Sequence, residues 1–191
     1  MAAAPDGAAW FTESCWKHPL NRSGHRASVD EIDAAGAIVR HPIARRFEPV
    51  SLAIGPDGSV WFGESQEFGG FGTGIGRVTP AGEVVEYRRP EGIGPRSIAV
   101  GPEGRLWFPA TTGGWQTRAL SSIGPAGDIG PRICLAPHCS LAPGSLVTGP
   151  EGNVWFTAQG LRSSAIGGGG SGLAEDARIA NQAGSIGLLS G

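Results

Sequence analysis

The chain has 191 residues, of which 33 are glycine and 15 are proline; 17% are charged and the net charge is −2. This near-neutral charge gives no electrostatic footprint for nucleic acid or an anionic membrane surface, and no apolar run approaches the roughly 20 residues that span a bilayer. Dense turn residues with few charges instead predict an all-β chain of many short strands over a continuous apolar core.

Four repeats are visible when the chain is compared with itself. Each has an apolar run, a Gly-Pro-Asp-Gly or similar turn, a small insert and then Trp-Phe. A period of roughly 45 to 50 residues is typical of propeller repeats. The approximate repeats are 2–46, 47–93, 94–141 and 142–191, with tryptophans Trp10, Trp61, Trp107 and Trp155. We expect these tryptophans to form the core between neighbouring blades.

The first half of each repeat is predicted to be a β-hairpin. In the second repeat, residues 52–54 are a short apolar run of the kind that fills a buried strand. Residues 60–62 return as a β-branched and aromatic strand. Between them, residues 55–58 read Gly-Pro-Asp-Gly, in which proline presets φ and the last glycine accepts a positive φ.

The second half of each repeat predicts two further strands. In the second repeat, residues 75–87 give a strand, a turn that ends at Gly82, and an alternating outer strand with one solvated face. The same half reappears at residues 29–43 and from Ser122, and residues 185–191 echo its beginning. Each repeat is therefore predicted to be a four-stranded blade.

These blades predict a partial β-propeller of about four blades. The chain begins inside the first blade, whose innermost strand is expected to be missing or vestigial, and it stops after the third strand of the fourth blade. We expect the open blade edges to promote self-association. A self-closed four-bladed ring and a dimer that completes the circle are the alternatives.

Residues 160–183 interrupt the repeat pattern and are expected to form a flexible insert. Their glycine-rich run, residues 167–172, lacks the Lys-Ser/Thr ending of a phosphate-binding loop. We therefore expect a mobile loop between strands and no nucleotide site.

The three cysteines are Cys15, Cys134 and Cys139. Cys134 and Cys139 could close a small disulfide loop if the protein is exported, or they could be reduced thiols. A metal site that combines them with His138 is a further alternative. The opening residues lack the basic and apolar regions of a signal peptide, and cytoplasmic and secreted locations both stay open.

Residues 55–87 and 94–108 carry a resemblance to a known family. Gly-Pro-Asp-Gly-Ser-Val-Trp-Phe-Gly-Glu-Ser and, after a short insert, Ile-Gly-Arg-Val-Thr-Pro-Ala-Gly-Glu-Val-Val-Glu-Tyr resemble the repeat of streptogramin lyases, also called virginiamycin B lyases. The resemblance implies a seven-bladed propeller. It also implies a carbon–oxygen lyase that opens cyclic depsipeptide antibiotics of the streptogramin B type by Mg²⁺-assisted elimination.

The same resemblance implies which residues to examine. In the family, a glutamate that closes Trp-Phe-Thr-Glu and a histidine in a Pro-His-Ala-Ile context belong to the active site. Glu13 and Glu64 match the glutamate and are candidate Mg²⁺ ligands; alternatively they face water or pair with Lys17 or Arg96. No histidine matches the base. The histidines are expected to be surface or turn residues: His18, His25, His41 and His138.

Hairpin geometry predicts a ligand site at the axial mouth. The Gly-Pro-Asp-Gly turns are expected to lie at one end of the blades. The inner strands then begin, and the Trp-Phe strands end, at the opposite end of the blades. Glu13, Glu64 and Arg96 occupy such positions, and Trp16 and Trp115 follow closely. We expect these five residues to line a mouth that binds a small molecule or peptide, although the two tryptophans could instead cover the rim.

Two functions are consistent with these patterns. The first is a lyase-like enzyme that acts on a cyclic ester, with Glu13 and Glu64 holding a divalent cation. The second is a non-catalytic propeller that binds peptide, sugar or protein. The missing base histidine favours the second for this chain, whereas the family resemblance favours the first.

Overall fold

The computed structural model describes residues 1–15, 26–44, 47–66, 73–88, 96–111, 117–134, 141–149, 152–160 and 186–189. The first sheet contains β1 (Ala2–Ala3), β2 (Ala9–Cys15), β3 (Arg26–Ile32) and β4 (Ile38–Pro42). The second contains β5 (Phe47–Ile54), β6 (Val60–Gln66), β7 (Thr73–Val78) and β8 (Val84–Arg88).

The third sheet contains β9 (Ala99–Val100), β10 (Leu106–Thr111), β11 (Thr117–Ile123) and β12 (Ile133–Cys134), with a short 3-10 turn (Pro102–Gly104) between its first two strands. The fourth contains β13 (Leu141–Thr148), β14 (Val154–Gly160) and β15 (Ile186–Leu189). Within the described residues, no helix is long and apolar enough to cross a membrane.

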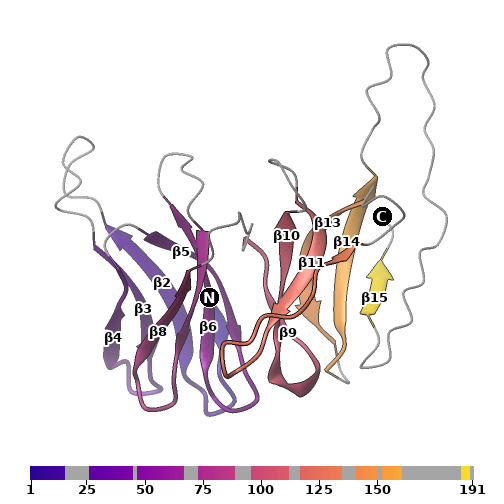
Figure 1. Ribbon diagram of the computed structural model, residues 1–191. Helices are drawn as coiled ribbons and strands as arrows, with labels where there is room; N and C mark the ends of the chain where they lie inside the picture. The colour runs from indigo at the N-terminus through magenta and orange to yellow at the C-terminus, as the bar shows by residue number, and fades with distance from the viewer. Residues whose placement is uncertain are drawn as a thin grey trace.

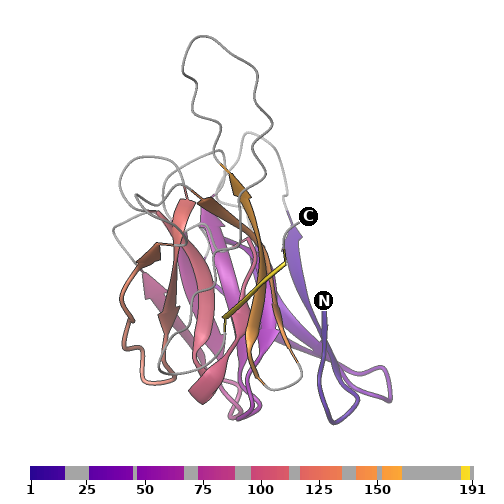
Figure 2. The same cartoon turned by 90° about the vertical axis from the view of Figure 1, so that its right-hand side faces the viewer.

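The four sheets form a partial β-propeller. In the first three sheets the strands follow one another as an antiparallel meander, in the order in which the chain makes them. Figure 1 shows the sheets in chain order, from the indigo first sheet to the orange and yellow fourth, and Figure 2 looks along this stack from the fourth sheet. The closest packing between sheets joins consecutive ones: β2 with β5, β5 with β9, and β11 with β13.

Glycines with positive φ make the hairpin turns, as the repeat motif predicts. Gly58 has a φ of 78°, and its N–H donates to Gly55 O across 3.0 Å. Asp57 stabilises this turn, because its Oδ1 accepts from the Ser59 N–H at 3.1 Å. The glycines with positive φ are Gly7, Gly58, Gly104 and Gly152 in the first turns and Gly36, Gly82 and Gly127 in the second turns.

The Trp-Phe dipeptide of each repeat packs in two directions. Side chains alternate across a strand, so adjacent residues face opposite neighbours. Phe62 packs with Trp10 and Val29 of the first sheet, whereas Trp61 packs with Ile98 and the rest of a cluster shared with the third sheet. The motif therefore supplies one aromatic ring to each of the two adjoining cores, which confirms the core role of Trp10 and Trp61.

The strands β1 and β15 lie in the first and last sheets of the array. The inner strand β1 has two residues, the same length as the inner strand β9 of the third sheet. β15 lies beside β14, but the pairing is parallel, with Ile186 opposite Val154, whereas a repeated meander predicts an antiparallel strand. The predicted flexible insert, residues 160–183, lies outside the described residues except for Gly160.

Candidate functional site

Glu64 lies near the end of β6, opposite Gly74 on β7. Its side chain is completely buried. A Cβ atom built on Gly74 would lie 2.7 Å from Glu64 Oε2, so the carboxyl group rests directly on the Gly74 backbone. By strand alternation Glu64 shares the face of Phe62, which packs against the first sheet. The structure thus places this glutamate on an inner packing face of the second sheet.

Glu13 occupies the corresponding position in the first sheet but has a different environment. Arg40 Nη2 lies 3.3 Å from Glu13 Oε2, and Arg40 Nε lies 3.5 Å from Asp30 Oδ2. Asp30 is completely buried, while Glu13 and Arg40 are partly exposed. Because Trp10 faces the second sheet, the alternation along β2 turns Glu13 to the opposite side. The partner of Glu13 is therefore Arg40, a residue of the outer strand β4.

The structure does not bring Glu13 and Glu64 together, because the first sheet lies between them. Among the described residues, no group of three or more His, Cys, Asp or Glu side chains gathers in a way that could hold a metal ion. Mg²⁺ prefers near-octahedral oxygen coordination. These two carboxylates do not fit a shared Mg²⁺ ion.

The other predicted mouth residues are only partly described. Arg96 is exposed, just before β9. Trp16, Trp115 and the alternative partner Lys17 lie outside the described residues. Cys134 is disulfide-bonded. Its predicted partner Cys139 lies outside the described residues, so that particular pairing stays a prediction.

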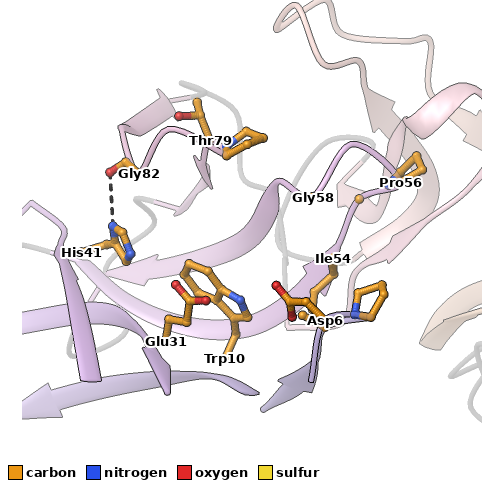
Figure 3. Close-up of a pocket in the computed structure, with 13 residues that line it drawn as sticks. Asp6, Trp10, Glu31, His41, Ile54, Pro56, Gly58, Thr79 and Gly82 are labelled. Atoms are coloured by element: carbon orange, nitrogen blue, oxygen red, sulfur yellow. Dashed lines mark hydrogen bonds between the residues drawn. The ribbon is translucent and has the colours of Figure 1, made fainter. Parts of the chain in front are cut away.

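A pocket of about 450 Å³ lies at the other end of the blades, between the turns of the first and second sheets. Figure 3 shows that Trp10 and Glu31 form one side, with Asp6 beside the indole and the turn residues Thr79 and Gly82 opposite. The lining residues are Ala4, Pro5, Asp6, Trp10, Glu31, His41, Ile54, Gly55, Pro56, Gly58, Thr79, Pro80 and Gly82.

His41 connects the two sheets at this pocket. Its ring stacks on Trp10 with centroids 5.3 Å apart, and its Nδ1 lies 3.2 Å from Gly82 O. A ring nitrogen that contacts a carbonyl oxygen carries the proton, so Nδ1 donates this bond. His41 is 8% exposed, and its Nε2 has no hydrogen-bond partner among the described residues. The expectation that His41 is a surface or turn residue is wrong, because strand pairing draws it beneath the turn of the next sheet.

The charge of the pocket is acidic. Asp6 and Glu31 line it, and its described lining contains no lysine or arginine. The Asp6 carboxylate accepts the Ala8 N–H at 3.0 Å, which is the same turn-stabilising contact that Asp57 makes in the second sheet. A cavity with an indole wall and two carboxylates is suited to a cation.

The equivalent space between the second and third sheets is filled by Arg77. Its Nη2 lies 2.6 Å from Asp57 Oδ2, its Nη1 donates to Pro125 O at 2.7 Å, and its guanidinium carbon lies 5.3 Å from the Trp61 ring centroid. Burial of the Asp57 carboxyl works to raise its pKa, but hydrogen bonds from Ser59 and the charge of Arg77 hold that pKa below its ordinary value.

Sequence reasoning missed the turn-end pocket because it concentrated on the opposite end of the blades. It assigned Trp10 to the core and gave Glu31 no role. The available signal was the repeat alignment: Glu31 pairs with Trp10 across the strands, just as Arg77 pairs with Trp61. A charge reversal at one position of a repeated frame marks a place where one blade differs in chemistry from the next.

Comparisons with known proteins identify the repeats. Residues 1–168 match the family model described as the virginiamycin B lyase family. A search of curated proteins found no match. Among solved structures, the chain is similar to a luciferin-regenerating enzyme, at 12% identity and a TM-score of 0.48, over 69% of this chain and 50% of that one. The alignment thus spans half the length of that enzyme.

Proposed function

Since the chain belongs to the virginiamycin B lyase family, we propose that it acts as a carbon–oxygen lyase on a cyclic ester of the streptogramin B type or a related small molecule. The observation that carries this proposal is the extent of the family match. It covers the first three sheets completely and strands β13 and β14 of the fourth. The repeated blades, rather than one isolated motif, support the assignment.

The reaction makes specific demands on the protein. A base removes the proton α to a carbonyl, the electrons form a carbon–carbon double bond, and the ester oxygen leaves as a carboxylate. Of the two glutamates that match the family motif, Glu13 is partly exposed and can contact a ligand, whereas Glu64 is completely buried. Glu64 lies against Gly74 of β7, and the proposal assigns no base among the described residues.

Mass spectrometry distinguishes this reaction from hydrolysis. Elimination opens the ring without adding an atom, so the linear product keeps the mass of the cyclic substrate but changes its chromatographic retention. Hydrolysis adds the mass of one water. We expect the purified chain with Mg²⁺ to convert streptogramin B to a product of unchanged mass, and Glu13→Gln to slow conversion more than Glu83→Gln, a control at an exposed turn residue.

Two results would refute the lyase proposal. Product heavier by one water would assign a hydrolase, and no conversion at any Mg²⁺ concentration would remove the enzymatic assignment. In the second case a non-catalytic propeller that binds a small molecule or peptide is favoured. The separation of Glu13 from Glu64 by the first sheet supports that second function, because it gives the described residues no composite catalytic centre.

A further inference from the structure

We propose that the acidic pocket between the first and second sheets binds an alkylguanidinium group, either as a small molecule or as an arginine side chain. This inference goes beyond the lyase proposal, since it concerns the turn end of the blades and makes no claim about turnover. Two equivalent spaces support it: the pocket between the first and second sheets, and the space between the second and third sheets. The second space is filled by the guanidinium group of Arg77.

Three parts of the repeat frame recur around both spaces: the tryptophan, the carboxylate of the first turn and the proline of the next sheet's second turn. Trp10 corresponds to Trp61. Trp10 lies opposite Glu31 on the next strand, and Trp61 lies opposite Arg77, so the charge at this position differs between the two spaces. The first-turn carboxylates correspond as well: Asp6 and Asp57 each accept the N–H of the second residue after them. Pro80 and Pro125 occupy the same place in the following second turn.

In the second space, this frame binds the Arg77 guanidinium on three sides. The Trp61 ring covers it at 5.3 Å, Asp57 Oδ2 and Ser59 Oγ each accept at 2.6 Å, and Pro125 O accepts at 2.7 Å. The first space lacks the hydroxyl, because Ala8 stands where the second sheet has Ser59. An indole face, a carboxylate and a carbonyl are the three kinds of partner that a planar cation with several N–H donors requires. The frame is therefore able to hold a guanidinium group.

In the first space, the frame is present but the arginine is replaced by Glu31. Trp10, Asp6 and Pro80 all line the resulting pocket, and Glu31 adds a second carboxylate to it. No described basic side chain is ion-paired with Glu31 or Asp6. The negative charge of this pocket is therefore available to an external cation.

His41 adds a second ring to the wall of the pocket. Tyr87 holds the corresponding position in the second sheet, where it stacks on Trp61 at 5.9 Å. In its place the His41 ring lines the pocket, and the bond from Nδ1 to Gly82 O at 3.2 Å fixes the orientation of that ring. The Asp6 and Glu31 carboxylates beside this ring favour a ligand with several N–H donors over an aprotic cation such as tetramethylammonium.

Calorimetric titration of the full chain with propylguanidinium tests the proposal. We expect saturable binding that propylurea, which is nearly isosteric but neutral, does not reproduce. Glu31→Gln keeps the size of the side chain and should weaken binding about fivefold, the effect of losing one partly exposed charge pair. Glu103→Gln is the control, because Glu103 is an exposed acid in the first turn of the third sheet, outside the pocket lining, and its replacement should leave binding unchanged.

Glu31→Arg is the second variant, since it recreates the occupied state of the neighbouring space. It should abolish propylguanidinium binding and raise the melting temperature. If a Gly-Arg-Gly peptide binds more strongly than propylguanidinium, the pocket is assigned to arginine side chains. If propylguanidinium binds more strongly, the pocket is assigned to small molecules. Equal binding of propylurea, or undiminished binding by both Glu31 variants, would overturn the proposal. Because the readout is binding, it is independent of lyase activity.

Discussion

Replacing Arg77 by methionine should loosen the contact between the second and third sheets. The substitution keeps most of the side-chain stem over Trp61 but removes the guanidinium group. Four interactions are lost: the ion pair with Asp57 at 2.6 Å, the bond to Ser59 Oγ at 2.6 Å, the bond to Pro125 O at 2.7 Å, and the cation–π contact at 5.3 Å. The Ser59 hydroxyl keeps its own bond to Asp57, so its loss as a partner of Arg77 adds little to the effect. Only the bond to Pro125 joins the two sheets directly, so it should dominate the effect.

The magnitude follows from the exposure of each partner. Arg77 is 14% exposed, and a hydrogen bond from such a charged group contributes about 1.5 to 3 kcal/mol. Asp57 is 44% exposed, so solvent screening reduces its ion pair to about 0.5 kcal/mol. The cation–π contact adds about 0.5 to 1 kcal/mol. After about 1 kcal/mol of side-chain entropy is regained, Arg77→Met should lower the free energy of unfolding by about 2 kcal/mol.

Thermal and urea unfolding monitored by circular dichroism measure this change. For a chain of this size, about 2 kcal/mol corresponds to a fall in Tm of about 4 to 8 °C. Arg96→Met is the control, because Arg96 is exposed and its replacement should change stability by less than about 0.5 kcal/mol. If Arg77→Met and Arg96→Met give the same Tm, the interpretation of Arg77 as a clamp between sheets is wrong.

Three further substitutions test other parts of the fold. Gly76→Ala should destabilise by about 3 kcal/mol in urea unfolding, because its Cβ would lie 2.0 Å from Cζ of the fully buried Phe62. Asp57→Asn should make the free energy of unfolding less dependent on acid pH. The native pKa of Asp57 is depressed, so its stabilising effect is present at neutral pH and is lost as the pH falls below about 3.9. The urea midpoints of the variant at about pH 7 and about pH 3 should therefore differ less than those of the parent. Val147→Lys should reduce self-association in light scattering, because Val147 is 58% exposed beside Trp155 on the outward face of the fourth sheet; unchanged oligomer size would show that this face is not the contact.

The hairpins were predictable because their determinants are local. A Gly-Pro-Asp-Gly turn fixes its own geometry through proline, the aspartate side chain and a final glycine such as Gly58, without help from distant residues. The direction of β15 was not predictable in this way. Its pairing depends on a long connection and on which edge of β14 is open, and neither is encoded in the residues of the strand itself.

The two motif glutamates show why the predicted site could not be read from the sequence. Glu13 and Glu64 follow the repeat tryptophan by the same interval, so pattern alone makes them equivalent. Their environments are determined by the neighbouring strands. Gly74 leaves room for the Glu64 carboxyl group to lie on β7, whereas Arg40 draws Glu13 along the outer face of the first sheet. Such cross-strand partners become visible only when register is known.

The same reasoning explains where new chemistry arises in a repeated fold. Residues that form turns and cores recur because each blade needs them, as Trp10 and Trp61 do. The residue paired with that tryptophan is less constrained by packing, and here it changes from Glu31 to Arg77 between adjacent sheets. Arginine at this position fills the space and, through its bond to Pro125 O, stabilises the contact between the second and third sheets. With glutamate, the same position leaves an open acidic pocket between the first and second sheets, where an external cation can take the place of the missing side chain.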